Sequence, residues 1–295
     1  MAANRSIPIL AKIAEIRQAV AEARRAGRTV GLVPTMGALH EGHRQLVERA
    51  RDEAGFVVVS IFVNPTQFGP NEDFRHYPRT LEADVELCAL AGAKVVFAPT
   101  VEEMYPRGPS STFVEVPSLA DRFEGASRPR HFRGVATVVL KLFAIVAPDL
   151  AFFGSKDYQQ LQVIRRMVAD LCVPVAIEAL PTVREADGLA MSSRNRYLDA
   201  NQRRAAVVLS RALKLAVKAV EAGEREADRV RQILVEAIRS EPLAELDYAE
   251  VADAESLEPV RLIVPGHSTV ALLAARVGPA RLIDNALLSP GSEKP

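Results

Sequence analysis

Residues 29–43 read Thr-Val-Gly-Leu-Val-Pro-Thr-Met-Gly-Ala-Leu-His-Glu-Gly-His, and this stretch decides the predicted fold. Its start, Thr29–Val33, is an apolar run typical of a buried strand. The residues that follow it, Arg44–Ala50, carry a helical pattern. His40 and His43 therefore lie where a helix begins, on one face of it. Because a helix N-terminus offers N–H groups and partial positive charge, the stretch predicts a polyphosphate site. A plain helix cap with two surface histidines is the alternative.

Apolar strand-like runs alternate with helical stretches over the first 180 or so residues. This alternation predicts an α/β fold, a parallel doubly wound sheet with helices on both faces. Ligands of such sheets bind beyond the carboxyl ends of the strands. The expected strands are 29–34, 56–63, 94–98, 150–153 and 173–180, and the expected helices are 10–25, 40–53, 80–91, 134–146 and 157–170.

The sequence changes character after Pro181. A polar loop over 183–197 leads to predicted helices over 199–222 and 226–240, with Asp199 as the N-cap of the first. Strand-like runs follow at 247–253, 269–275 and 281–285. We therefore predict a nucleotide-binding domain over 1–183, a smaller α+β domain over 184–288 that closes over the site, and a tail over 289–295.

Composition restricts the partners of the chain. Hydrophobic residues make up 48% and charged residues 25%, and the formal net charge is zero. No overall field therefore recruits nucleic acid or an anionic membrane, and an anionic ligand needs a local cluster of donors. No apolar run reaches the roughly 18 residues of a membrane span. Cys88 and Cys172 both lie in apolar segments and read as buried thiols of a reducing compartment, which predicts a cytoplasmic protein.

Two further segments have the chemistry of an anion site. In Phe153–Gln160, Gly154 permits close approach of a ligand, Lys156 supplies a point charge, and Asp157 begins a helix where it could accept from a ribose. In Met191–Arg196, two serine hydroxyls stand beside two guanidinium groups, which suits an anion clamp. A capped helix with a surface lysine and a solvated interdomain linker are the respective alternatives.

Neutral polar groups follow the second predicted strand. Asn64 and Gln67 suit the binding of hydroxyls or a carboxylate. Asp84, near the start of a helix, could reach magnesium, which commonly takes one or two protein carboxylates beside substrate phosphates; a surface acid is the alternative. A basic loop over 122–133 is either a mobile wall of the site or a simple connection.

The histidine pair is a poor candidate for zinc. The zinc motif H-E-x-x-H places its histidines four apart and needs a third ligand. Here the spacing is three, and no suitable motif follows.

Five segments taken together resemble the pantothenate synthetases (pantoate–β-alanine ligases), a family of the nucleotidylyltransferase superfamily with its H-x-G-H motif. The resemblance runs from about Ile7 to Asn285. The matching segments are 34–43, 62–68, 77–80, 154–160 and 184–195. Met191–Arg194 is similar to the second signature loop of that superfamily.

The resemblance implies a Rossmann-like first domain, a homodimer formed through it, and an AMP-forming ligase. Pantoate carboxylate would attack the α-phosphorus of ATP to give pantoyl adenylate and pyrophosphate, and β-alanine would then release AMP and pantothenate. Mg²⁺ would accompany ATP, with Asp84 as the candidate ligand. Two positions depart from many relatives: Ser155 replaces Glu or Gln, and Ala83 replaces a second acid, which weakens the case for Asp84.

Site residues carry over from the resemblance position by position. The implied catalytic residues, which stabilise phosphate charge, are His40, His43, Lys156, Ser192, Ser193 and Arg194. The implied ATP-binding residues are Met36, Gly42, His43, Gly154, Lys156, Asp157, Val183, Met191, Ser192, Ser193 and Arg194. The implied pantoate-binding residues are Pro34, Met36, Phe62, Asn64, Gln67, Val139 and Gln160.

Two alternatives stay open at this point. Another nucleotidylyltransferase would keep the nucleotide in its product, whereas a ligase releases AMP. A non-catalytic nucleotide-binding module would show gaps in the phosphate-binding set, and none is seen.

Overall fold

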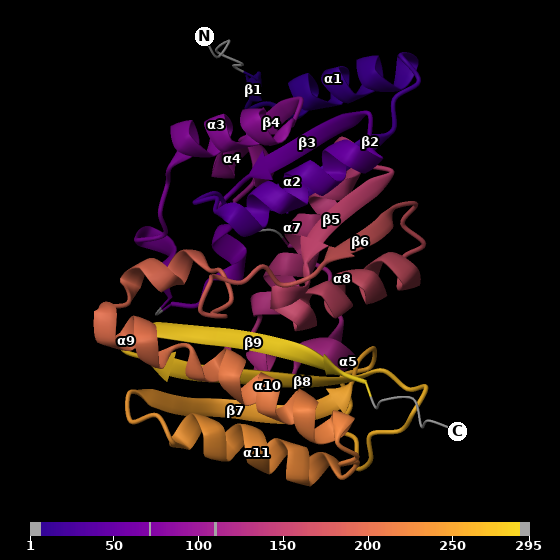
Figure 1. The fold of residues 1–295 in the computed structure, drawn as a ribbon. Coiled ribbons are helices and arrows are strands. Elements are labelled where there is room, and N and C mark those ends of the chain that lie inside the picture. The colour runs from indigo at the N-terminus through magenta and orange to yellow at the C-terminus, as the bar shows by residue number, and fades with distance from the viewer. Residues whose placement is uncertain (1–6, 71, 109–110, 290–295) are drawn as a thin grey trace. The chain divides into compact units, whose positions relative to one another are not determined.

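The computed structural model describes residues 7–70, 72–108 and 111–289 (Figure 1). The chain forms two compact units. Of the described residues, the first unit comprises those up to 155 together with 159–181, and the second comprises 156–158 together with those from 182 to 289. The sequence places the boundary after residue 183. Residues 290–295 of the predicted tail lie outside the described ranges.

A parallel sheet forms the centre of the first unit. Its six described strands lie in the order β1-β4-β3-β2-β5-β6. Because the order runs outward from β2 in both directions, the sheet is doubly wound, which confirms the predicted fold class. The strands are β1 (Ile9–Leu10), β2 (Val30–Thr35), β3 (Phe56–Ile61), β4 (Val95–Phe97), β5 (Leu150–Gly154) and β6 (Ala176–Leu180).

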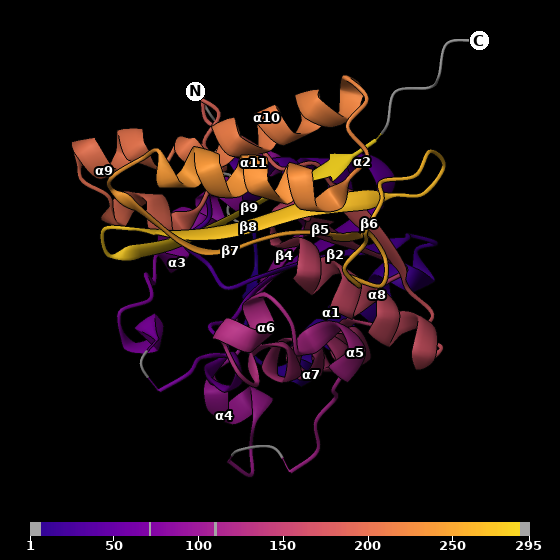
Figure 2. The same ribbon diagram turned by 90° about the horizontal axis from the view of Figure 1, so that it is seen from below.

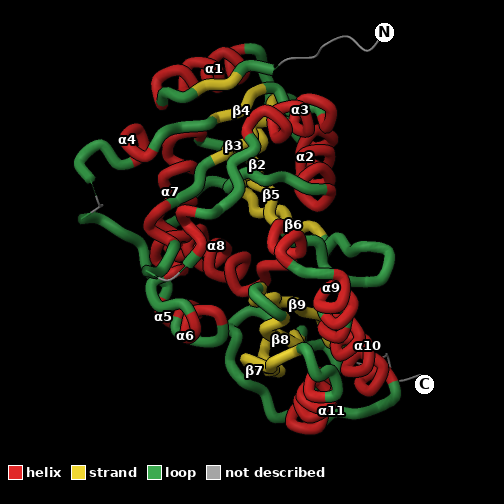
Figure 3. Tube along the Cα trace, turned by 90° about the vertical axis from the view of Figure 1, so that its left-hand side faces the viewer, coloured by secondary structure: helices red, strands yellow, loops and turns green. Residues whose placement is uncertain are grey.

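Helices lie on both faces of this sheet (Figure 3). Helices α2 and α3 lie on one side, and α1 and α7 on the other. Four predicted helices of this unit begin one to three residues later than expected, and α7 begins three residues earlier, at His131. The helices are α1 (Ile13–Arg25), α2 (Glu41–Glu53), α3 (Leu81–Ala91), α4 (Val101–Met104), α5 (Pro117–Ala120), α6 (Glu124–Ser127), α7 (His131–Val146) and α8 (Tyr158–Asp170).

Branched apolar residues of the central strands form the core beneath α2 and α3. Val33, Val59 and Phe152 are fully buried there, packed with Val47 of α2 and Cys88 of α3. Burial raises the pKa of the Cys88 thiol to about 12, so this cysteine is an inert core residue. Burial of such side chains is the main term that stabilises the sheet–helix layers.

The second unit is an antiparallel sheet with helices on one face (Figure 2). Its described strands lie in the order β7-β8-β9. Apolar residues of α10 and α11, such as Leu213 and Leu234, are buried against Leu273 of the central strand. The elements are α9 (Ala200–Ala205), α10 (Val208–Glu221), α11 (Ala227–Arg239), β7 (Ala244–Asp253), β8 (Thr269–Val277) and β9 (Ala280–Leu288).

Three local predictions were wrong. The helix expected over 199–222 divides into α9 and α10, because the backbone tightens at Ala206–Val207 to hydrogen bonds between residues three apart. Strand β1 overlaps the expected helix 10–25 at Leu10, and its two residues are too few to show a period. Cys172 is exposed, because it follows the end of α8 in a left-handed turn. In the described part of the chain, none of the helices is long and apolar enough to cross a membrane.

A buried ion pair fixes the start of the 183–197 loop within the second unit. Both oxygens of the Asp284 carboxylate accept from Arg184, at 2.7 and 3.0 Å. The Asp284 side chain is only 1% exposed. Its negative charge is therefore stabilised chiefly by this guanidinium, in the bidentate geometry that favours arginine.

We expect Arg184→Met to destabilise the second unit by about 3–5 kcal/mol, because it leaves the Asp284 carboxylate buried without its cation. The matched control is Arg229→Met. Arg229 pairs with Glu226 on the surface, where the two side chains are 66% and 60% exposed. The control should cost less than about 1 kcal/mol. Urea unfolding measures the free energy of unfolding of both variants. Equal losses of stability would contradict the stabilising role of the Arg184–Asp284 ion pair.

Candidate active site

Two histidine rings cap the N-terminus of α2. The Nδ1 atom of His40, the N-cap residue, accepts from the backbone N–H of Gly42 at 3.2 Å. Nδ1 of His43 accepts from the N–H of His40 at 3.3 Å. The two ring centroids are 4.1 Å apart. The pair therefore forms a reciprocal capping box, made of imidazoles in place of a hydroxyl and a carboxylate.

This arrangement determines the tautomer of both rings. A backbone N–H can only donate, so Nδ1 of each ring carries a lone pair. The proton of each neutral imidazole is then on Nε2. Two Nε2–H donors at a helix N-terminus would suit the oxygens of a phosphate chain, which is the role that the sequence predicts for His40 and His43.

Glu41, between the histidines, is held by a different partner. Both of its carboxylate oxygens accept from Arg44, at 2.6 and 2.5 Å. The hydrogen bond from Arg44 lowers the pKa of Glu41. Among the described residues, no cluster of three or more His, Cys, Asp or Glu side chains is arranged to hold a metal ion.

Asp84 anchors the loop that precedes the histidines. Its Oδ2 accepts from the N–H of Ala38 at 2.9 Å, and its Oδ1 accepts from the N–H of Leu39 at 2.8 Å. The hydroxyl of Thr80 lies 3.2 Å from both oxygens. Ala38 has a φ of 51°, in the region that disfavours a residue with a Cβ atom, so the loop needs such restraint.

These contacts make Asp84 poorly suited to bind magnesium. The residue is 3% exposed, and both oxygens already accept hydrogen bonds. A metal ion at Asp84 would have to displace the backbone donors of the loop. The sequence predicts an acid near the start of α3. It does not predict the backbone partners of that acid, which are 45 and 46 residues away along the chain.

The loop after β3 brings several predicted pantoate residues together. Asn64 caps the short helix η1 (Pro65–Gln67), and its amide contacts the Gln67 amide at 3.0 Å. Nε2 of Gln67 lies 3.2 Å from Sδ of Met36. Met36 follows β2 and Gln67 follows β3, and these strands pair in parallel with Thr35 beside Ile61. Adjacent carboxyl ends thus place the two loops side by side.

Apolar residues predicted for the pantoate site lie on the same unit. Phe62 and Val139 are each 5% exposed, and Pro34 is half-buried near the end of β2. Gln160, half-buried, lies in the first turn of α8. Tyr105, whose ring is 6.3 Å from that of Phe62, was missed by sequence reasoning because it follows α4, a helix of only 4 residues.

The other predicted phosphate residues belong to the second unit, apart from Gly154, which ends β5. Lys156 and Asp157 lie in the short helix η3 (Ser155–Asp157), and their charged atoms are 3.9 Å apart. The carbonyl of Lys156 accepts from Nδ2 of Asn285 at 2.8 Å, which ties this turn to β9. The Lys156 side chain is 20% exposed.

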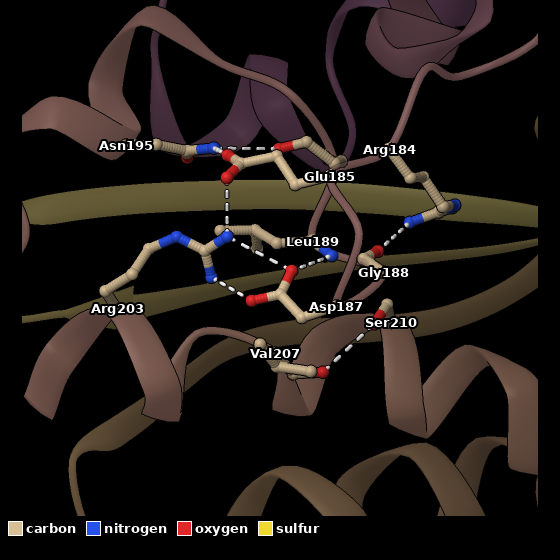
Figure 4. A network of polar contacts seen from close by, with 10 residues as sticks. Arg184, Glu185, Asp187, Gly188, Leu189, Asn195, Arg203, Val207 and Ser210 are labelled. Carbon is tan, nitrogen blue, oxygen red and sulfur yellow. Dashed lines mark hydrogen bonds and ion pairs between the residues drawn. The ribbon is translucent and has the colours of Figure 1, made fainter. Parts of the chain in front are cut away.

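The 183–197 loop is ordered by ion pairs (Figure 4). Arg203 of α9 donates to Glu185 at 2.6 Å and to Asp187 at 2.7 Å, and Asn195 donates to Glu185 at 2.8 Å. Arg184 also donates to the carbonyl of Gly188 at 3.1 Å. The acids at the start of the loop thus hold its later part and α9, which sequence reasoning did not foresee.

The segment predicted to clamp phosphate lies within this framework. The N–H of Met191 donates to the carbonyl of Val183 at 2.9 Å. Ser192 caps the short helix η4 (Ser193–Tyr197), and its Oγ accepts from the N–H of Arg194 at 3.3 Å. Ser192, Ser193 and Arg194 are therefore presented by a defined turn rather than by an extended linker.

Comparison with known proteins identifies the family of this chain. The family model described as pantoate–β-alanine ligase matches residues 8–287. A pantothenate synthetase of Pelotomaculum thermopropionicum is 56% identical over 276 residues, covering 94% of this chain and 97% of the relative. One of Moorella thermoacetica is 56% identical over 280 residues, covering 95% and 98%.

Solved structures give the same result. The crystal structure of pantothenate synthetase from Thermus thermophilus superposes with a TM-score of 0.90 at 48% identity, covering 96% of this chain and all of the other. A pantoate–β-alanine ligase from Francisella tularensis, complexed with β,γ-ATP and β-alanine, has a TM-score of 0.77 at 33% identity, with coverage of 95% and 97%. The chain belongs to the pantoate–β-alanine ligase family.

Proposed function

We propose that the chain condenses pantoate with β-alanine at the expense of ATP, through pantoyl adenylate. Pantoate carboxylate attacks the α-phosphorus and pyrophosphate leaves. The β-alanine amine then attacks the acyl carbon of the mixed anhydride, so that AMP leaves and the amide of pantothenate forms. Membership of the family supports this reaction, and the two Nε2–H donors at the start of α2 are the observation that carries it.

The first step needs charge stabilisation rather than a base. A carboxylate is already ionised at neutral pH. Acceleration then comes from aligning the reactants and from neutralising the phosphate charge that develops as pyrophosphate leaves. We assign this role to His40, His43, Lys156, Ser192, Ser193 and Arg194. The remaining ATP contacts are assigned to Met36, Gly42, Gly154, Asp157, Val183 and Met191.

Pantoate binding is assigned to the loops after β2 and β3. Pro34, Met36, Phe62 and Val139 supply apolar surface for the gem-dimethyl group, and Gln67 and Gln160 supply amides for its oxygens. The contact between Gln67 and Met36 supports a common pocket for the polar and apolar parts of the substrate. We further propose a cytoplasmic homodimer formed through the first unit.

We expect His40→Ala and Lys156→Ala to fold normally and to lose pantoate-dependent exchange of labelled pyrophosphate into ATP by roughly 100-fold or more, the usual cost of one charge-stabilising donor. His267→Ala is the matched control, since His267 is exposed on a loop of the second unit. Exchange at the wild-type rate in either active-site variant would contradict the assigned roles.

Magnesium is proposed to enter with ATP, and Asp84→Asn tests whether Asp84 binds it. Because Asp84 anchors the 37–40 loop, the Asp84→Asn variant should lower the exchange rate at saturating Mg²⁺. The substitution places an NH₂ group against backbone N–H donors. The Mg²⁺ concentration for half-maximal rate should stay unchanged. Glu82→Gln, an exposed acid of the same helix, is the control. A raised Mg²⁺ requirement, relieved by excess Mg²⁺, would show instead that Asp84 is a ligand.

A further inference from the structure

The side chain of Asn64 is buried, and the backbone fixes the orientation of its amide. The residue is 1% exposed. Its Oδ1 accepts from the N–H of Thr66 at 3.4 Å, and its Nδ2 donates to the carbonyl of Gly134 at 3.2 Å. Since a backbone N–H only donates and a carbonyl only accepts, the oxygen and nitrogen of Asn64 cannot be exchanged.

Two hydroxyl groups reinforce this orientation. The hydroxyls of Tyr105 and Thr66 lie 2.8 and 3.0 Å from Oδ1 of Asn64, which can only accept. Burial raises the pKa of Tyr105, so the phenol keeps the proton that it donates. Nζ of Lys141 lies 4.7 Å from the centre of the Tyr105 ring and helps to hold it in place.

The orientation of Asn64 determines that of Gln67. The second N–H of Asn64 Nδ2 donates to Oε1 of Gln67 at 3.0 Å. Nε2 of Gln67 therefore points away from Asn64, toward Sδ of Met36 at 3.2 Å. Thioether sulfur is a weak acceptor, which a substrate oxygen can replace with a gain in hydrogen-bond strength.

The backbone of Gln67 is held independently by the start of α7. Nδ1 of His131 donates to the carbonyl of Gln67 at 2.8 Å, while Nε2 of the same ring lies 3.0 Å from Nη1 of Arg128, a donor. Gly134 permits the close approach, since a Cβ there would lie 2.5 Å from the carbonyl oxygen of Thr66. The side chain of Gln67 thus projects from a fixed backbone.

We propose that Asn64 and Tyr105 are positioning residues that make Gln67 an obligate hydrogen-bond donor to the substrate, so that the pocket selects a ligand oxygen at this point. The inference rests on the proposed binding of pantoate by Gln67. It also changes the role of Asn64, predicted from the sequence as a pantoate contact: both polar atoms of the Asn64 side chain have partners within the protein, so it acts through Gln67.

The first test is Asn64→Asp, which keeps the shape of the side chain. The new oxygen would face the Gly134 carbonyl and Oε1 of Gln67, and the Gln67 amide should turn to present its oxygen to the substrate. We expect the pantoate KM in the exchange assay, and the pantoate Kd from calorimetry, to rise roughly 10- to 100-fold. The ATP KM should change by less than about twofold, because the lost contact is to pantoate alone.

The second test, Tyr105→Phe, introduces no buried charge and keeps the ring beside Lys141. It should raise the pantoate Kd roughly fivefold, the effect of one buried hydrogen bond. In a Gln67→Ala background the same substitution should have no further effect, because its target is gone. Tyr248→Phe, in β7 of the second unit, is the control.

The outcomes separate the inference from the function on which it rests. If Gln67→Ala leaves the pantoate Kd unchanged, the proposed role of Gln67 fails. If Gln67→Ala weakens binding but Tyr105→Phe does not, or does so equally in both backgrounds, then Tyr105 does not act through Gln67 and the inference is overturned. If Asn64→Asp fails to fold, the comparison of Tyr105→Phe in the wild-type and Gln67→Ala backgrounds alone tests the inference.

Discussion

The first turn of a helix leaves backbone N–H groups without partners inside the helix. The candidate site in the first unit depends on the side chains that accept from such backbone N–H groups. At α2 the acceptors are the Nδ1 atoms of His40 and His43. In the preceding loop, the N–H groups of Ala38 and Leu39 bind the carboxylate of Asp84. Backbone N–H groups at the start of α2 therefore position both imidazoles and leave both Nδ1 atoms without a proton.

The same principle operates at Gln67. A donor and an acceptor of the backbone orient Asn64, and Asn64 orients the amide that faces Met36. In both places, groups whose hydrogen-bonding role cannot change determine the role of groups that could act either way. The side chains proposed for catalysis and for substrate binding are thereby positioned by local backbone geometry at the carboxyl ends of neighbouring strands.

Sequence reasoning could predict what depends on local patterns. Strands β2 to β6 and the long helices of the first unit have clear periodicity, and the H-x-G-H motif lies where a strand ends and a helix begins. Tyr105 and the anchoring role of Asp84 depend on partners 41 or more residues away, so no local signal indicates them. The 183–197 loop looked like an adaptable clamp because its charges are dense. Only the fold shows that Arg184 and Arg203 are paired with acids within the second unit.

The histidine cap of α2 has a consequence for engineering. Serine, threonine, aspartate and asparagine are the residues that best stabilise a helix N-terminus, and His40 occupies that position in their place. A search for thermostable variants would therefore select against the imidazole at residue 40, which we propose binds phosphate. Libraries built on this scaffold should hold that position constant, since the melting temperature is a misleading guide there.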